Sequence, residues 1–401
     1  MPDLMPVLRP RLPSSADILP YLRSIDERRW YSNRGPLVTR LEERLSRHLG
    51  LENGGVVTTA NATVGITAAL LALRAPAGSL CLMPSWTFAA TPHAARAAGM
   101  KPWFHDVDSR TWALHPDEVL TTLRGISERV GAVIVVSPFG APIDMEAWEA
   151  FDERTGIPVV VDAAAGFDTV QPGRIPSVVS LHATKILGAG EGGFIATTDS
   201  SLRDRLQACC NFGFQATRSA ALPALNAKMS EYHAAVALAS LASWPALRPG
   251  LIRIAEWYCR HIAGLEGVSL QPGYGNGSAS GTTSVILPPH SAPRTARGLL
   301  HLGIETRAWW GEGCHAQPAF ADCPRGPLPV TEDLGGRVLG LPQFPGMEER
   351  HVQRVAQAIA KALGRQAPME LIRLAHALDL PEYSGLPAGL AVAITPVPAP
   401  R

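Results

Sequence analysis

The sequence predicts an α/β fold with a mainly parallel sheet in a large domain, residues 1–245, followed by a smaller α+β domain, residues 246–365. In the first part, short apolar runs alternate with helical patterns of about ten residues or more, which is typical of parallel sheets. After residue 245 this alternation stops. The chain has 401 residues, 46% of them hydrophobic, which is enough apolar material for two cores.

The large domain is expected to form its strands in the apolar runs and its helices between them. The apolar runs lie at 54–60, 79–86, 101–108, 131–140, 157–164, 178–181 and 194–197. Segments with helical spacing lie at 63–75, 90–99 and 144–156. Ligand groups gather at the carboxyl ends of strands in such sheets. The residues that follow each run are therefore the first candidates for a functional site.

The part of the chain after residue 245 has a different pattern. Residues 245–265 predict a long helix, 282–289 a strand, and 347–363 an amphipathic helix. A proline-rich tail, residues 366–401, follows them. Whether residues 1–35 pack on the large domain or elsewhere is left open.

Composition and charge exclude several classes of function. The formal net charge is +1, with 36 basic and 35 acidic residues scattered along the chain, so nothing predicts binding to nucleic acid or to an anionic membrane. The six cysteines form no C-x-x-C pair, and the twelve histidines show no metal-binding spacing. We therefore expect no metal and a reduced, cytoplasmic setting.

A lysine and a carboxylate follow two of the predicted strands. Lys185 comes a few residues after the run at 178–181, and Asp162 ends the valine-rich run before it. Three further features lie at the ends of the same or other strands: a helix start that could hold a phosphate with its backbone N–H groups, a hydroxyl and an aromatic ring. They are supplied by Asn61, Ala62, Thr63, Ser180 and Phe88.

Together these groups meet the requirements of pyridoxal 5′-phosphate (PLP). A lysine would form the Schiff base, a carboxylate would keep the pyridine nitrogen protonated, an aromatic plate would stack on the ring, and a helix start would cradle the phosphate. Glycines after the lysine would let the backbone turn tightly near the cofactor. They are Gly188, Gly190, Gly192 and Gly193.

The stretch SLHATKILGAGEGG, residues 180–193, resembles the lysine motif of the nucleotide-sugar aminotransferases of the DegT/DnrJ/StrS type. Other motifs of that family are matched in order along the chain from about residue 30 to 365. They are GPLVTRLEE (35–43), PSWTFAAT (84–91), AGMKPWFHDVD (98–108), NAKMSEYHAA (226–235), GIETRAWW (303–310) and VLGLPQFP (338–345). One such motif is weak evidence, whereas this many in one order is specific.

The resemblance implies the fold type I architecture of PLP-dependent transferases, with a mainly parallel seven-stranded sheet. It also implies an aminotransferase that converts a keto-sugar nucleotide to an amino-sugar nucleotide, in amino-sugar and polysaccharide biosynthesis. An amino acid, expected to be glutamate, would be the donor.

The resemblance also implies roles for single residues. Lys185 would form the Schiff base and shuttle protons, Asp162 would pair with the pyridinium nitrogen, and Phe88 would stack on the ring. Asn226, in a loop before a buried helix predicted from Met229 onward, resembles an asparagine that reaches the neighbouring subunit's phosphate, which implies a homodimer with shared active sites. The ligands of the phosphate would be Ala62, Thr63 and Ser180.

Two departures from the family pattern keep other functions open. Ala165 lies where the family usually has glutamine or histidine, and the link from Asp162 to Lys185 is several residues shorter than usual. The alternatives are a PLP-dependent deoxysugar dehydratase, whose relatives carry histidine in place of the lysine, and a non-catalytic PLP-binding regulatory protein. Lys185 argues against the former.

Several side chains outside the lysine motif are weaker candidates for substrate binding. Trp309, Trp310 and His315 could face the sugar nucleotide, or could belong to aromatic packing in the smaller domain. Arg34 could meet a substrate phosphate or carboxylate, or could be a solvated loop arginine.

Overall fold

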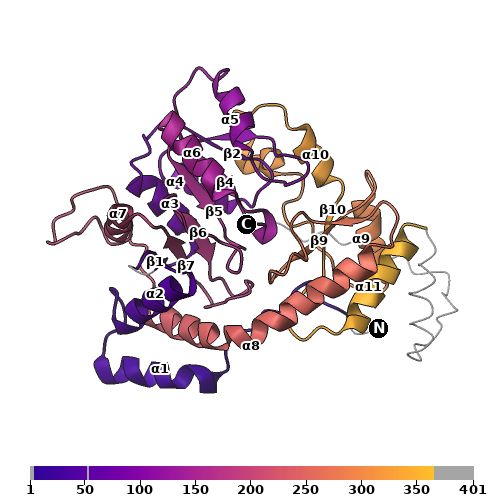
Figure 1. Ribbon diagram of the computed structural model, residues 1–401, viewed down its shortest axis with the longest axis horizontal. Coiled ribbons are helices and arrows are strands. Elements are labelled where there is room, and N and C mark those ends of the chain that lie inside the picture. The colour runs from indigo at the N-terminus through magenta and orange to yellow at the C-terminus, as the bar shows by residue number, and fades with distance from the viewer. Residues whose placement is uncertain (1–3, 52–53, 365–401) are drawn as a thin grey trace, which may run out of the picture.

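The predicted α/β fold with its mainly parallel sheet is confirmed by the computed structural model, which describes residues 4–51 and 54–364 (Figure 1). The predicted tail lies outside these residues. The large sheet has seven strands in the order β1-β7-β6-β5-β4-β2-β3. The strands are β1 Val56–Thr59, β2 Leu80–Pro84, β3 Lys101–His105, β4 Val130–Val136, β5 Val159–Asp162, β6 Ser177–Ser180 and β7 Gly193–Ala196.

All strands of the large sheet except β7 run in one direction. The pairs β2–β3, β2–β4, β4–β5 and β5–β6 are parallel, and β7 is antiparallel to both β6 and β1. The carboxyl ends of β1, β2, β4, β5 and β6 therefore lie along one edge of the sheet, where ligand groups gather.

Helices cover both faces of this sheet, as its near-continuous apolar strands require. One core contains side chains of α3, α4 and α7, and the other contains side chains of α1, α2, α5, α6 and α8. The helices are α1 Ser15–Arg28, α2 Pro36–His48, α3 Ala62–Ala72, α4 Ala90–Ala97, α5 Pro116–Leu123, α6 Met145–Thr155, α7 Ser200–Cys210 and α8 Glu231–Ile262.

The long helix α8 joins two regions that the sequence predicted as separate helices. Its first part packs in the core of the large sheet, and its last part packs in a second core around a smaller sheet (Figure 1). Pro245 and Pro249 lie inside the helix, both exposed. A proline removes one backbone hydrogen bond, but burial on either side of the pair keeps the helix continuous. The division predicted at residue 245 therefore falls inside a helix, and the two-domain description stays a prediction.

Helix α8 is also long and apolar enough to cross a membrane, judged by length and composition alone. Its side chains take part in both cores, which is the packing of a core helix in a globular protein.

The smaller sheet contains three antiparallel strands in the order β10-β9-β8. The N-terminal segment packs on this part of the molecule, because Met5 pairs with Ile304 and lies in the same core. The elements after α8 are β8 Ser269–Leu270, β9 Thr283–Ile286, β10 Val338–Leu341, α9 Ala292–His301, α10 Pro329–Gly335 and α11 Glu349–Ala362, with short 3₁₀ turns at Cys314–Ala316 and Pro318–Phe320. A further 3₁₀ turn, Pro138–Gly140, directly follows β4.

A buried carboxylate ties the start of α8 to the start of α2. Glu231 is 1% exposed, and its two oxygens accept hydrogen bonds from the backbone N–H groups of Leu37, at 2.8 Å, and Val38, at 2.9 Å. These donors have no partner within α2, and the negative charge suits the positive end of the helix. A side chain at Gly35 would meet the carboxylate, since a Cβ there would lie 2.7 Å from Cδ of Glu231.

The substitution Glu231→Ala is expected to lower the free energy of unfolding by about 3 kcal/mol, because it leaves two buried donors without a charged acceptor. Glu256→Ala, on an exposed position of the same helix, is the matched control and should change stability by less than about 0.5 kcal/mol. Guanidinium unfolding followed by circular dichroism measures both. Equal, small effects would show that Glu231 does not hold α2.

Candidate active site

A cavity of about 640 Å³ lies at the carboxyl ends of the large sheet and is lined on one side by segments that follow α8 in the chain. It is lined by residues from the loops after β1, β2, β4, β5 and β6, together with segments near residues 281 and 309. The structure brings together most of the residues that the sequence predicted for one site. These are Asn61, Ala62, Thr63, Phe88, Asp162, Ser180, Lys185, Trp309 and Trp310.

Lys185 lies in the tight loop that follows β6, where its backbone N–H donates to the carbonyl of His182 at 2.9 Å. Among the described residues, no side chain forms a hydrogen bond or ion pair with its amine. Burial lowers the pKa of Lys185, and the nearby Asp162 carboxylate offsets part of this effect. The neutral amine, which is the nucleophilic form, is therefore more available than in an ordinary lysine.

Asp162 is the last residue of β5 and is 6% exposed. Its Oδ2 accepts a hydrogen bond from Oγ1 of Thr91 at 2.8 Å, and its Oδ1 accepts one from the backbone N–H of Ala164 at 3.2 Å. Burial raises the pKa of Asp162, whereas these hydrogen bonds and the positive charge of Lys185 lower it. The carboxylate is held in one orientation and can accept a further proton-bearing nitrogen from the cavity.

The start of α3 forms the anion-binding part of the cavity. The Asn61 side chain accepts a hydrogen bond from the backbone N–H of Val64 at 3.0 Å, so it caps the helix and leaves the N–H groups of Ala62 and Thr63 without a partner in α3. The backbone of Gly193 lies close to this helix start, since a Cβ at Gly193 would be 2.8 Å from the nitrogen of Ala62. Free N–H groups and the helix dipole favour a phosphate.

Aromatic rings line the other walls. Phe88 is 61% exposed, although the preceding Thr87 is buried, and its side chain lines the cavity. Trp310 stacks on Phe139 with ring centroids 4.2 Å apart and planes 13° apart. Phe139 has a left-handed backbone, with φ of 53°, which is costly for a bulky residue and is often found at functional sites. The segment that contains Trp310 thus meets the loop after β4 through an aromatic contact at the cavity.

Phe139 and Ser137 were missed by the sequence analysis, although both lie near the end of the predicted run 131–140, just after β4, and could have been found by the same rule as Asp162. Leu8 and Thr282 also line the cavity. They come from distant segments, and no local pattern marks them. Ala165 borders the cavity too, with only a methyl group.

Three predicted residues do not line this cavity. Asn226 is exposed, and its Oδ1 accepts a hydrogen bond from Nζ of Lys228 at 2.6 Å. Arg34 forms an ion pair with Glu42, with Nη2 and Oε2 2.7 Å apart. His315 shares a hydrogen bond with Oγ of Ser85, 2.8 Å from its Nδ1. Within one chain, none of the three contacts the space around Lys185.

The cavity fits pyridoxal 5′-phosphate by the chemistry of its donors and acceptors. Unpartnered N–H groups at the start of α3 suit a phosphate, the buried Asp162 suits a protonated pyridine nitrogen, and the accessible amine of Lys185 suits an aldehyde. The exposed ring of Phe88 can cover an aromatic ring.

Comparison with known proteins points to the same chemistry. The model of the DegT/DnrJ/EryC1/StrS aminotransferase family matches residues 14–360. The UDP-N-acetyl-3-dehydro-alpha-D-glucosamine 3-aminotransferase of Acidithiobacillus ferrooxidans is 30% identical over 331 residues, which are 80% of this chain and 88% of that one. The dTDP-4-amino-4,6-dideoxy-D-glucose transaminase of Escherichia coli is 26% identical over 370 residues, 88% of this chain and 98% of that one.

Among solved structures, that of DesI in the presence of its TDP-sugar product has a TM-score of 0.80 and is 31% identical. The match covers 94% of this chain and 96% of that one.

The low pKa of Lys185 leads to a testable expectation for the cofactor-free protein. Competitive acetylation with trace acetic anhydride, read by mass spectrometry across pH, should show Lys185 reaching half of its maximal reactivity at lower pH than N-acetyl-lysinamide added as an internal standard, because burial lowers its pKa. Because the Asp162 charge raises the pKa of Lys185, Asp162→Asn should move this midpoint lower still. A midpoint equal to that of the standard, or a shift upward in Asp162→Asn, would contradict the assigned environment.

Proposed function

The chain belongs to the DegT/DnrJ/EryC1/StrS aminotransferase family, and on that premise we propose that it aminates a keto-sugar nucleotide with an amino acid, glutamate, as donor. It is a PLP-dependent aminotransferase. The observation that carries the proposal is the meeting of Lys185, Asp162 and the start of α3 around one cavity. The class of substrate is supported by the relatives, which are named as transaminases of UDP- and dTDP-sugars.

Each of these groups has a distinct task toward the cofactor. The N–H groups of Ala62 and Thr63 and the hydroxyl of Ser180 would hold the phosphate, and Phe88 would cover the ring. Asp162 would keep a proton on the ring nitrogen, and Lys185 would bind the aldehyde carbon covalently. When bound, the cofactor stabilises the negative charge that develops at a carbon as it loses its proton.

Lys185 then moves the proton. When its Nζ is free and neutral it would act as the general base, because burial lowers the pKa of Lys185. It would take the proton from Cα of the donor and deliver it to C4′ of the cofactor, and the keto-sugar would be converted by the reverse transfer. Phe139 and Trp310 limit the access of water to this space.

The direct test supplies the protein with isotope-labelled glutamate and a panel of keto-sugar nucleotides that differ in nucleotide and in the position of the ketone. Mass spectrometry should find the labelled nitrogen in the sugar of at least one compound. Lys185→Ala should abolish the transfer. Labelled nitrogen only in simple oxo acids, with none in any sugar nucleotide, would overturn the proposed substrate class.

We further propose a cytoplasmic homodimer in which each active site uses residues of both chains. Asn226 and Arg34 do not line the cavity of their own chain, but they lie near each other. Arg34 and Lys228, the hydrogen-bond partner of Asn226, both carry positive charges that act on the thiol of Cys210. Large aromatic side chains nearby are exposed, as a subunit interface would require. They are Trp30, Tyr31, Phe212 and Tyr232. Asn226 would reach the phosphate bound by the partner.

A mixed dimer separates this arrangement from one in which Asn226 only serves its own chain. An Asn226→Ala chain is combined with a Lys185→Ala chain. If Asn226 serves the partner, both defects fall on one site, and the dimer should keep about half of the wild-type activity, since the other site is intact. If the activity does not exceed half that of the Asn226→Ala homodimer, the cross-subunit role is excluded.

A further inference from the structure

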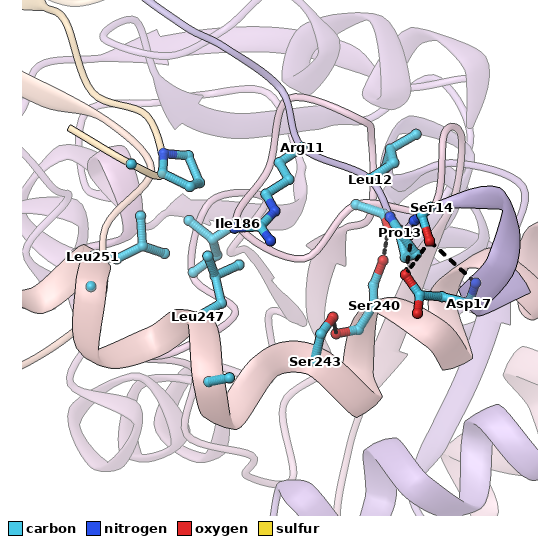
Figure 2. A pocket seen from close by; sticks show the side chains of 15 residues that line it. Arg11, Leu12, Pro13, Ser14, Asp17, Ile186, Ser240, Ser243, Leu247 and Leu251 are labelled. Atoms are coloured by element: carbon cyan, nitrogen blue, oxygen red, sulfur yellow. Dashed lines mark hydrogen bonds between the residues drawn. The ribbon is translucent and has the colours of Figure 1, made fainter.

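A second cavity, of about 440 Å³, lies next to the lysine loop and is not part of the active site (Figure 2). Its walls come from four segments: the N-terminal residues 11–17, the loop residues Ile186 and Gly188, the middle of α8, and residues 345–346. A volume of this size suits a small organic ligand.

Close backbone contacts fix the walls of this cavity. Oγ of Ser240 on α8 donates a hydrogen bond to the carbonyl of Gly188 at 2.5 Å. The N-terminal segment lies so near the loop that a Cβ at Gly188 would be 2.8 Å from Cδ2 of Leu12. The lysine loop is thus held between α8 and the N-terminal segment, and the cavity is a feature of this packing.

The cavity is lined by one positive charge, on the exposed Arg11, and by one negative charge, on Asp17. The Arg11 side chain extends from the N-terminal segment towards Ile186 (Figure 2), and no described residue forms a hydrogen bond or ion pair with it. Asp17 also borders the cavity, but its Oδ2 already accepts hydrogen bonds from the backbone N–H of Ser14, at 3.0 Å, and its Oγ, at 2.6 Å.

The other walls are mixed, with aliphatic side chains on one part and the hydroxyl groups of Ser14 and Ser240 on another. Leu12, Ile186, Leu247 and Leu251 surround the space, with a hydroxyl from Ser243. One unpaired guanidinium beside an aliphatic wall matches a ligand with one carboxylate and a short hydrocarbon chain, since guanidinium binds carboxylate in a bidentate manner. A polyphosphate would need several cations.

We infer that this cavity is a second binding site, for a small aliphatic carboxylate whose charged end meets Arg11 and whose hydrocarbon part lies on Leu247 and Leu251. The site goes beyond the aminotransferase activity. Ile186 borders it, the active-site cavity, and a narrow space of about 30 Å³ between them that also contacts Arg11 and Lys185. An occupant would therefore contact the residue that directly follows the catalytic lysine.

The test is isothermal calorimetry on the holoenzyme with isocaproate, which has neither an amino nor an oxo group and cannot react at Lys185. Isocaproate should bind saturably at millimolar concentration, and its uncharged amide should not. Leucine and its oxo acid, titrated into Lys185→Ala protein, distinguish an amino acid from an oxo acid as the physiological source; either result is compatible with a carboxylate site.

Variants of the walls assign the binding to this cavity. Arg11→Gln should weaken isocaproate binding at least about tenfold, as expected for loss of a charge-assisted hydrogen bond, and Arg23→Gln, on exposed α1, should not. Ala246→Leu should abolish binding by filling the cavity, whereas Ala242→Leu, one turn away on α8 and outside the lining, should leave it unchanged.

Three results would overturn the inference: no saturable binding, unchanged affinity in both Arg11→Gln and Ala246→Leu, or inorganic phosphate competing as strongly as isocaproate. Circular dichroism and melting temperature confirm that each variant is folded before titration.

Discussion

A carboxylate and an amine share the same buried space at the carboxyl edge of the large sheet, and the rest of the site depends on the proximity of these two groups. Asp162 stays in place because Thr91 and the backbone of Ala164 donate to it, although burial favours its protonated form. Lys185 loses part of its affinity for a proton in the same surroundings. Burial thus makes the Lys185 amine readier to give up its proton, whereas hydrogen bonds oppose the protonation of Asp162; in the proposed reaction the carboxylate would hold a proton on the ring.

The long helix α8 connects the site to the rest of the molecule. Its first residue, Glu231, holds the start of α2, and Ser240 holds the lysine loop through the carbonyl of Gly188. Its last part packs against the smaller sheet. Helix α8 therefore contacts the loop of Lys185, the start of α2 and the smaller sheet. The second cavity lies along the same helix.

The fold and the centre of the site could be predicted from sequence because their signals are local. Apolar runs marked each strand of the large sheet, and Asp162, Lys185 and the cap Asn61 all lie within a few residues of a strand end. The stacking of Phe139 on Trp310 joins residues far apart in the sequence, so no local pattern could show it. The prolines in α8 predicted a break that packing in two cores overrides. Asn226 and Arg34 lie where only a second chain would give them a role in the site.

The central claim is that Lys185 is the residue that carries the cofactor, and reduction of the holoenzyme with borohydride tests it most directly. The chain has four lysines, Lys101, Lys185, Lys228 and Lys361, so peptide mapping can assign the adduct without ambiguity. The account predicts a phosphopyridoxyl group on Lys185 alone and none on the other three. An adduct on Lys228 or on a surface lysine, with Lys185 unmodified, would contradict it.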